Sequence, residues 1–329
     1  MNQQICKVPI LSLVALALVL LFRGAQPAFA QAQPPNDATV AARTLAAAKS
    51  WGYQLQKIDP DVLAAAPYDV LVIDYSRDGT DISALTADEI RKLKTRPDGG
   101  RRIVLAYLSV GEAEKYRYYW QPDWETSALA PPWLAQPNKR YLTNFPVRYW
   151  HADWQAIVFR GPNSYLGRIL KAGFDGIYLD RVDVHQEFEK ENPAAAEQMM
   201  AFVKALAAHA RSLRPGFLIV PQNGEELLEE AGYRAVIDGI AKEDLLFGDG
   251  RSKHPNSQKI IDAGVRHLEP LMRDRKPVFV VEYLDNPQDI VSARTRIEEF
   301  GFIPHFASRA LNRMRIGDLP DPPAKAGRR

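Results

Sequence analysis

The stretch GFDGIYLDRVD, residues 173–183, decides the fold. Its centre, Gly176 to Asp180, is an apolar run with branched and aromatic side chains that ends in a carboxylate. A run this apolar is typical of a parallel-sheet strand that is covered on both faces. Barrels of such strands build their active sites where the strands end, and this is where Asp180 stands.

Similar runs recur along the chain, each followed by a helical or turn-rich segment. Counted with the first, they are 51–55, 70–75, 103–109, 176–180, 217–222, 236–240, 278–283 and 302–306. Helices are expected at 86–94, 165–172, 193–213, 225–231, 257–273 and 287–300. Eight alternations of strand and helix predict an α/β fold, a (β/α)8 TIM barrel formed by one domain over residues 49–316.

One connection is too long for an ordinary loop. Residues 112–162 follow the third strand and carry five tryptophans. Long excursions on the loop side of a barrel are usually functional. We therefore expect an aromatic-rich insertion after strand 3 that covers one side of the barrel mouth, with Trp120, Trp150 and Trp154 as candidates to stack on a substrate.

The N-terminus has the pattern of a signal peptide. Lys7 precedes an apolar run at 8–22, and AFA at 28–30 supplies small residues for cleavage. The run of about fifteen residues is short for a membrane-spanning helix, which needs about twenty. We expect residues 1–30 to be removed, leaving a secreted or periplasmic protein without stable membrane insertion; an uncleaved anchor is the alternative. Residues 31–48 are expected to form a linker and an N-terminal helix, and residues 317–329 a disordered tail.

The mature chain is electrically balanced. The full sequence has 42 basic and 40 acidic side chains, and the signal peptide removes Lys7 and Arg23, leaving 40 of each. Such a balance argues against a nucleic-acid partner. Cys6, the only cysteine, also leaves with the signal, so the mature chain has no disulfide and no thiolate metal site. We expect a monomer.

Acidic and amide side chains close most of the predicted strands. The candidates for substrate binding are Tyr53, Asp74, Tyr107, Glu112, Asp183, Gln222, Asn223, Glu282 and Tyr283, around the carboxylates Asp180 and Glu243. A metal, a cationic substrate or ordinary ion pairs could balance this charge. No His-x-His or His-Glu-x-x-His spacing is present, so we expect no metal and no other cofactor. A single carboxylate of this kind is more often structural, but the set favours function.

Paired carboxylates with aromatic neighbours are typical of glycoside hydrolysis, in which one acid protonates the leaving oxygen and another attacks or stabilises the sugar. Other chemistries fit less well. The sequence has no Gly-x-Ser-x-Gly elbow, no phosphate-binding glycine loop and no cysteine nucleophile in the mature chain. The residues alone do not decide which carboxylate would be the nucleophile.

Several segments resemble those of glycoside-hydrolase family 114, whose founding activity is endo-α-1,4-polygalactosaminidase, and of its bacterial and archaeal relatives. They are WGYQLQ at 51–56, YDVLVIDYSRDG at 68–79, VLAYLSVGEAEKYR at 104–117, GFDGIYLDRVD at 173–183, VPQNGEEL at 220–227, DGIAKEDLLFG at 238–248 and VVEYLDN at 280–286. GFDGIYLDRVD and the Tyr-Leu-Ser-x-Gly-Glu motif are the most specific of these.

The resemblance implies a TIM barrel with a catalytic pair, Asp180 as nucleophile and Glu243 as acid/base. It further implies an endo-acting enzyme and a partner that is an amino-sugar polysaccharide. The chain departs from the polygalactosaminidases after Glu243, where it reads KEDLLFG and lacks their cysteines. A non-catalytic carbohydrate-binding or exopolysaccharide-assembly protein and a metal-dependent hydrolase are the alternatives.

Overall fold

The computed structural model describes residues 37–126, 128–161, 163–249 and 251–315. The chain divides into two units, residues 1–34 and 35–329, and every described residue belongs to the second. The expected signal peptide at 1–30, the linker residues up to 36 and the tail at 317–329 lie outside the described residues. No helix in the described part is long and apolar enough to cross a membrane.

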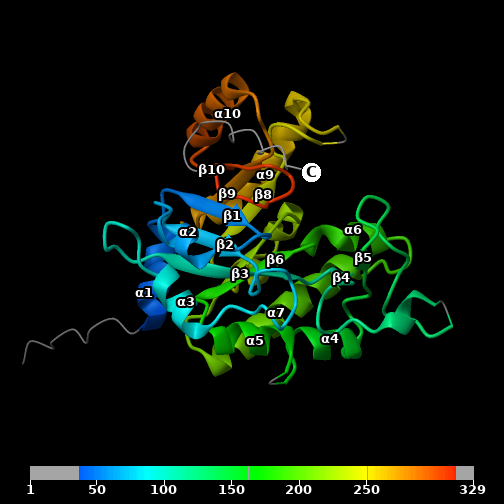
Figure 1. The fold of residues 1–329 in the computed structure, drawn as a ribbon. Helices are drawn as coiled ribbons and strands as arrows, with labels where there is room; N and C mark the ends of the chain where they lie inside the picture. The colour runs from blue at the N-terminus through cyan, green and yellow to red at the C-terminus, as the bar shows by residue number, and fades with distance from the viewer. Residues whose placement is uncertain (1–36, 127, 162, 250, 316–329) are drawn as a thin grey trace, which may run out of the picture. The chain divides into compact units, whose positions relative to one another are not determined.

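Parallel strands form the centre of the described unit (Figure 1). They are β1 (Trp51–Gln54), β2 (Val70–Ile73), β3 (Ile103–Ser109), β6 (Gly176–Asp180), β7 (Leu218–Pro221), β8 (Ile240–Glu243), β9 (Val278–Glu282) and β10 (Ile303–Phe306). Their pairing follows the order β1-β2-β3-β6-β7 in one ladder and β8-β9-β10 in a second. An isolated parallel bridge between Gln222 and Ala241 joins the two ladders.

Side chains connect the remaining edges, β1 and β10. The indole Nε1 of Trp51 donates to the carbonyl oxygen of Ile303 at 2.9 Å. The backbone N–H of Tyr53 donates to Nε2 of His305 at 3.3 Å. Within the described residues the eight strands thus pair in two ladders, with a seam of side-chain contacts between β1 and β10.

Helices and short 3-10 turns connect the strands. The helices are α1 (Asp37–Ala46), α2 (Pro60–Ala64), α3 (Ala87–Leu93), α4 (Ala152–Val158), α5 (Tyr165–Ala172), α6 (His185–Phe188), α7 (Ala195–Leu213), α8 (Ala231–Arg234), α9 (Gln258–Arg273) and α10 (Pro287–Glu299). The 3-10 turns are η1 (Pro122–Glu125), η2 (Val182–Val184) and η3 (Glu225–Glu229). Capping residues determine where several helices begin. Ser164 caps the N-terminus of α5, and Thr86 with Glu89 forms a capping box at the N-terminus of α3.

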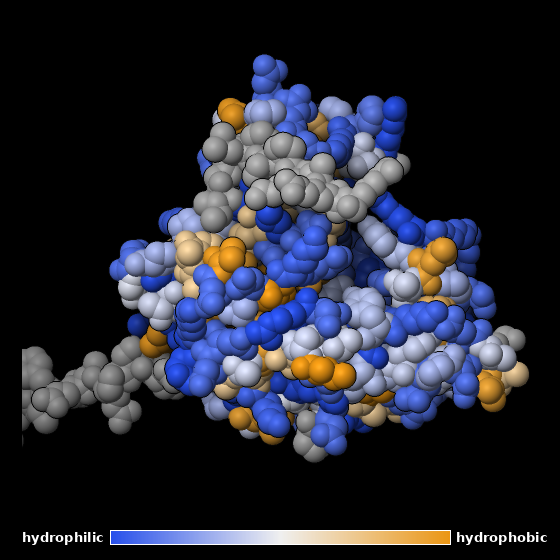
Figure 2. All heavy atoms as spheres, in the orientation of Figure 1, coloured by the Kyte–Doolittle hydropathy of each residue, from blue (hydrophilic) through white to orange (hydrophobic). Residues whose placement is uncertain are grey.

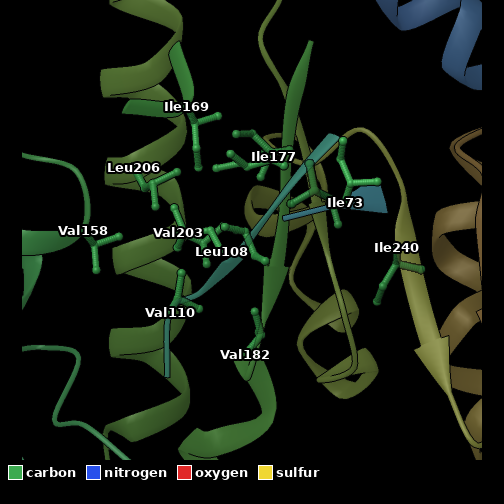
Figure 3. Close-up of a cluster of buried hydrophobic side chains, with 14 of the residues drawn as sticks. Ile73, Leu108, Val110, Val158, Ile169, Ile177, Val182, Val203, Leu206 and Ile240 are labelled. Carbon is green, nitrogen blue, oxygen red and sulfur yellow. The ribbon is translucent and has the colours of Figure 1, made fainter. Parts of the chain in front are cut away.

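The buried apolar residues form two clusters, one between the strands and the helices and one inside the barrel. The larger one lies between strands and helices, where Val203 and Leu206 of α7 pack toward Leu108 of β3 (Figure 3). The smaller cluster fills the interior and includes Trp51 and Tyr178. Leu45 of α1 belongs to this interior cluster, so α1 covers the N-terminal ends of the strands. The C-terminal ends remain available for a site.

The sequence places seven of the eight strands within about two residues, and the sixth is the exception. The prediction of residues 236–240 is wrong, because β8 spans Ile240–Glu243. Ile237 packs in the outer cluster, and the N–H of Asp238 donates to the carbonyl of Ile219, so this segment is the connection that leads into β8. The helix expected at 225–231 is also different: η3 is followed by the short α8.

The insertion after β3 forms a small substructure with its own core. Strands β4 (Glu112–Glu114) and β5 (Asn144–Pro146) pair antiparallel. Trp154 is fully buried, and its indole donates to the carbonyl of Val110 at 2.9 Å. The rings of Trp120 and Trp133 pack on other aromatic rings of the insertion. These tryptophans stabilise the insertion itself.

Candidate active site

At the C-terminal ends of the strands, the side chains that face the barrel interior are polar. Along β6, β7, β8 and β9 every second side chain faces inward, and apolar residues occupy the lower inward positions. The next inward positions at the C-terminal ends hold Asp180, Gln222, Glu243 and Tyr283. Parallel strands bring these ends to one rim, so residues distant in sequence converge there.

The rim encloses a cavity of about 1080 Å³. Of the residues selected from the sequence, it is lined by Tyr53, Asp74, Tyr107, Glu112, Asp180, Asp183, Gln222, Asn223, Glu243 and Tyr283. Of the residues proposed for catalysis and for the polar contacts of the site, Glu282 is the one that does not line it. Hydrophilic side chains dominate the face seen in Figure 2, and apolar residues are scattered over it.

Gln222 connects the two central carboxylates. Its amide nitrogen donates to Oδ1 of Asp180 at 3.0 Å and to Oε2 of Glu243 at 3.1 Å. The hydroxyl of Tyr178 donates to the amide oxygen of Gln222 at 2.5 Å, which turns the nitrogen toward the carboxylates. Since both oxygens contact one nitrogen, these two distances limit their separation to about 6 Å.

Three donors hold Asp180. Besides Gln222, the hydroxyl of Tyr107 donates to Oδ2 at 2.7 Å, and the N–H of Arg181 donates to Oδ1 at 2.8 Å. Burial, with the nearby charge of Glu243, raises the pKa of Asp180 to about 7. Near neutral pH this carboxyl therefore holds a proton for part of the time.

Glu243 has a different set of partners. The hydroxyl of Tyr283 donates to Oε1, and a guanidinium nitrogen of Arg309 lies 3.7 Å from the same oxygen. Burial raises the pKa of Glu243, while Tyr283 and Arg309 oppose the rise. Asn223 accepts the backbone N–H of Glu243 at 3.0 Å and so fixes the end of β8. Both carboxyls of the pair thus have raised pKa values, and the pair favours retaining one proton.

Left-handed backbone turns follow these strand ends. Arg181, Asn223 and Asp244 have φ values of 61°, 58° and 56°. Such conformations are costly for residues other than glycine and persist where the surrounding structure imposes them. Here they redirect the chain immediately after Asp180, Gln222 and Glu243.

Asp74 belongs to a buried ion-pair network. Its two oxygens contact the guanidinium of Arg117 at 3.0 and 2.7 Å, and Arg117 also contacts Glu114 at 2.6 Å. The ring of Tyr116 lies 4.8 Å from the guanidinium carbon of Arg117. Burial raises the pKa of Asp74, and Arg117 opposes this. Although Asp74 lines the cavity, its oxygens are engaged by the protein.

Glu112 is also engaged by the protein. Asn138 and Asn144 of the insertion donate to its two oxygens at 2.7 and 3.2 Å. Arg181 contacts the first of these oxygens at 3.0 Å. Glu112 therefore ties the insertion to the loop after β6.

Asp183 lies beyond the central pair, 3.5 Å from the guanidinium of Arg181. Burial raises the pKa of Asp183, with Arg181 opposing. Nearby, Lys242 forms an ion pair with Glu225 at 2.9 Å, and this partner raises the pKa of Lys242 although burial acts in the opposite direction. These charged side chains form a part of the cavity wall next to the central pair.

Glu282 faces away from the cavity. It is the residue after the inward-facing Val281 of β9, so its side chain points to the helical side. There it is fully buried and accepts the N–H of Leu246 at 2.6 Å, and burial raises its pKa to about 8. The structure thus assigns Glu282 to the support of the loop after β8.

None of the arginines at the site is among the sequence candidates, and two of them, Arg309 and Arg117, hold carboxylates of the cavity wall. Arg309 contacts both oxygens of Asp244 at 2.9 Å and lies 4.0 Å from the ring centre of Tyr283. Arg117 holds Asp74 and Glu114. Neither arginine ends a strand, so strand-end reasoning missed them; the only available signal was that so many carboxylates need cations.

The tryptophans proposed for stacking do not line the cavity, so that expectation is wrong. The insertion contributes Tyr116, Asn138, Arg140, Tyr141 and Asn144 instead. In the part of the chain that the structure describes, no three potential metal-ligating carboxylate, imidazole or thiolate side chains converge as a metal site would require.

The chain is similar to proteins from distant organisms. An uncharacterized protein of Methanocaldococcus jannaschii is 34% identical over 271 residues, which cover 78% of this chain and 75% of that protein. An uncharacterized protein of Deinococcus radiodurans is 34% identical over 275 residues, covering 82% and 83%. The glycoside hydrolase domain of PelA from Pseudomonas aeruginosa superimposes with a TM-score of 0.62 at 19% identity, covering 81% of this chain and 97% of that domain.

The structural match confirms the TIM-barrel-like α/β fold predicted from the sequence. The model of glycoside-hydrolase family GH114 matches residues 30–318, which is most of the chain. This match agrees with the resemblance found in GFDGIYLDRVD and the other segments. The chain therefore belongs to glycoside-hydrolase family GH114.

Proposed function

We propose that this glycoside hydrolase is an exported, endo-acting enzyme that cleaves an α-1,4-linked polysaccharide containing galactosamine. Asp180 and Glu243 are its catalytic pair. The observation that carries the proposal is the shared contact with Gln222, which holds two half-buried carboxyls close together in the cavity. Two carboxyls that retain one proton provide both an acid and a nucleophile.

The short separation favours retention of anomeric configuration. Retaining glycosidases hold their carboxyls about 5–5.5 Å apart, and inverting enzymes leave roughly 6.5–9.5 Å for a water. Gln222 keeps one oxygen of Asp180 within about 6 Å of one oxygen of Glu243, and this proximity of the facing oxygens favours the first class. We therefore infer a covalent glycosyl-enzyme intermediate.

In the first step an oxygen of Asp180 attacks the anomeric carbon, and Glu243 gives its proton to the leaving oxygen as the glycosidic bond breaks. In the second step water attacks the same carbon, Glu243 takes a proton from it, and the bond to Asp180 breaks. The three donors to Asp180 favour its role as nucleophile, because they fix both of its oxygens, and the hydrogen bond from Tyr107 opposes part of the rise in pKa that burial and Glu243 cause.

The charge of the cavity favours a cationic polymer. Among the described lining residues there are ten aspartates and glutamates against six lysines and arginines. Free amino groups of galactosamine units would complement this excess of negative charge. The proposed polymer, with α-1,4-linked galactosamine units, is taken from the founding activity of the family. The enzyme is further proposed to be a monomer.

The test measures release of reducing ends from partly deacetylated α-1,4-galactosamine polymer. Glu243→Gln is expected to lower kcat about 10²–10⁴-fold, and Asp180→Asn at least as much. The matched control is Asp123→Asn, a change at an exposed aspartate that does not line the cavity. Product configuration followed by NMR distinguishes retention from inversion.

Other outcomes would favour the alternatives. Polymer that is bound without release of reducing ends would identify a carbohydrate-binding protein. Loss of activity with EDTA would identify a metal-dependent hydrolase. The export part is tested separately by N-terminal sequencing of purified protein, which is expected to begin at or near Gln31; Met1 in a membrane fraction would contradict it.

A further inference from the structure

A segment of the insertion is fixed over the cavity by Glu112. Asn138 and Asn144 donate from their side chains to the two oxygens of this carboxylate. The N–H of Asn138 donates to the carbonyl of Asn144 at 2.7 Å, which closes the segment into a loop. Glu112 is almost fully buried at the start of β4 and contacts Arg181, which follows β6, at 3.0 Å, so the loop 138–144 is attached through it to the barrel.

The tip of this loop carries Arg140 and Tyr141. The side-chain oxygen of Asn138 accepts the N–H groups of both residues, at 2.9 and 3.2 Å, so the backbone of the tip is ordered by hydrogen bonds. Both side chains line the cavity. Asp244 lines the same cavity, and burial raises the pKa of this carboxyl while the charges of Arg309 and Arg140 oppose the rise.

Tyr141 differs from the other aromatic residues of the cavity. Tyr53, Tyr107 and Tyr283 are buried beside the central carboxyls. Tyr116 is partly exposed, but its hydroxyl donates to Glu114 at 2.5 Å. Tyr141 lines the cavity and has 47% of its surface exposed, so its ring is accessible to a ligand there.

We propose that Tyr141 and Arg140 form a distal subsite that stacks an uncharged, N-acetylated sugar unit of the polymer, away from the bond that is cleaved. The proposal rests on the proposed function and adds a specificity to it. The exposed ring offers a flat apolar face to the C–H face of a sugar. The guanidinium of Arg140, 5.6 Å from that ring, repels a free ammonium group at the same position.

The cavity then has two electrostatic regions. Acidic side chains around Asp180 and Glu243 accept units with free amino groups, and the loop tip selects a unit without one. The enzyme would therefore recognise a pattern of acetylation along the chain rather than uniform positive charge. A fully deacetylated polymer would lack the unit that the distal subsite prefers.

The experiment compares Tyr141→Ala with Leu142→Ala. Leu142 is 71% exposed on the same loop and does not line the cavity, so its variant controls for changes in the loop surface. Binding to partly N-acetylated α-1,4-galactosamine polymer is measured calorimetrically in an Asp180→Asn background. Tyr141→Ala is expected to weaken this binding about tenfold, and Leu142→Ala less than about twofold.

A second measurement uses active protein. The ratio of kcat/KM on the polymer to kcat/KM on a disaccharide is expected to fall about tenfold in Tyr141→Ala, because a disaccharide bound at Asp180 and Glu243 would leave the proposed distal subsite empty. Arg140→Gln is expected to narrow the preference for N-acetylated over fully deacetylated polymer. An unchanged ratio or unchanged polymer binding in Tyr141→Ala overturns the subsite. A wild-type protein that neither binds nor cleaves the polymer overturns the proposed function and the subsite together.

Discussion

The buried carboxyls of this barrel differ in how their charge is balanced. Both oxygens of Asp74 contact the guanidinium of Arg117, as expected for a structural ion pair. Asp180 instead receives neutral donors from Gln222 and Tyr107 and faces a second carboxyl. A half-buried charge held mainly by neutral donors opposes folding, which is typical of groups that are held for chemistry.

This difference predicts opposite effects on stability. Burial raises the pKa of Asp180 to about 7, so between its ordinary pKa near 3.8 and pH 7 the folded protein holds more protons than the unfolded chain. Rising pH therefore lowers the free energy of unfolding across this window. Asp180→Asn removes the titration, so its Tm relative to wild type should increase from pH 4 to pH 7.

The matched control is Asp74→Asn. In this variant the buried Arg117 keeps Glu114 as its remaining carboxylate contact in the described network. We expect the free energy of unfolding to fall by about 3–5 kcal/mol at pH 7. Thermal unfolding between pH 4 and pH 8 checks both variants. If Asp180→Asn lost stability as Asp74→Asn does, Asp180 would be a structural residue.

At the scale of the element, strand ends could be found from sequence but the direction of each side chain could not. Glu282 ends an apolar run as Asp180 does, yet it points outward because it follows the inward Val281. A shift of one residue exchanges the faces of a strand. The true position of β8, four residues after the predicted start, shows how easily the register is lost in runs that are apolar on both faces.

The connection that follows β3 packs closely against the connection that follows β6. A Cβ on Gly111, which follows β3, would lie 2.2 Å from the carbonyl oxygen of Arg181, which follows β6. Backbone at that distance must move, and the movement would displace Asp180. We expect Gly111→Ala to lower the free energy of unfolding by about 1–3 kcal/mol and to lower kcat strongly.

Gly232→Ala is the control for this substitution. The added Cβ would meet only the end of the flexible Lys204 side chain, at 3.3 Å, and Gly232 lies in α8. Alanine in a helix is favoured by roughly 0.5–1 kcal/mol over glycine, so this variant should keep or gain stability. Equal Tm values for the two variants would contradict the packing argument.

For the whole molecule, the alternation of eight strands with helices was sufficient to predict the barrel, because that pattern is local and repeated. The partners of the site were not predictable in the same way. Arg309 reaches Asp244 from 65 residues away, and Arg117 reaches Asp74 from 43. No periodic pattern encodes such pairs; the closure of the fold creates them.

The seam between β1 and β10 gives the last prediction. The N–H of Tyr53 donates to Nε2 of His305, so this imidazole must stay neutral. Burial, with Arg315 and Arg294 nearby, lowers the pKa of His305 to about 3, well below its ordinary 6.5. Between these values the unfolded chain binds more protons, so stability falls as pH falls from 6.5 toward 3.

His305→Gln keeps a neutral acceptor at the seam and removes this titration. We expect wild type to be the more stable protein at pH 7 and its advantage in Tm to shrink steadily toward pH 4, as measured by thermal unfolding. His254→Gln, a change at an exposed histidine, should track wild type throughout. If the His305→Gln and wild-type curves remained parallel over this range, protonation of His305 would not control the seam, and the acid sensitivity of the barrel would have to arise from its carboxylates instead.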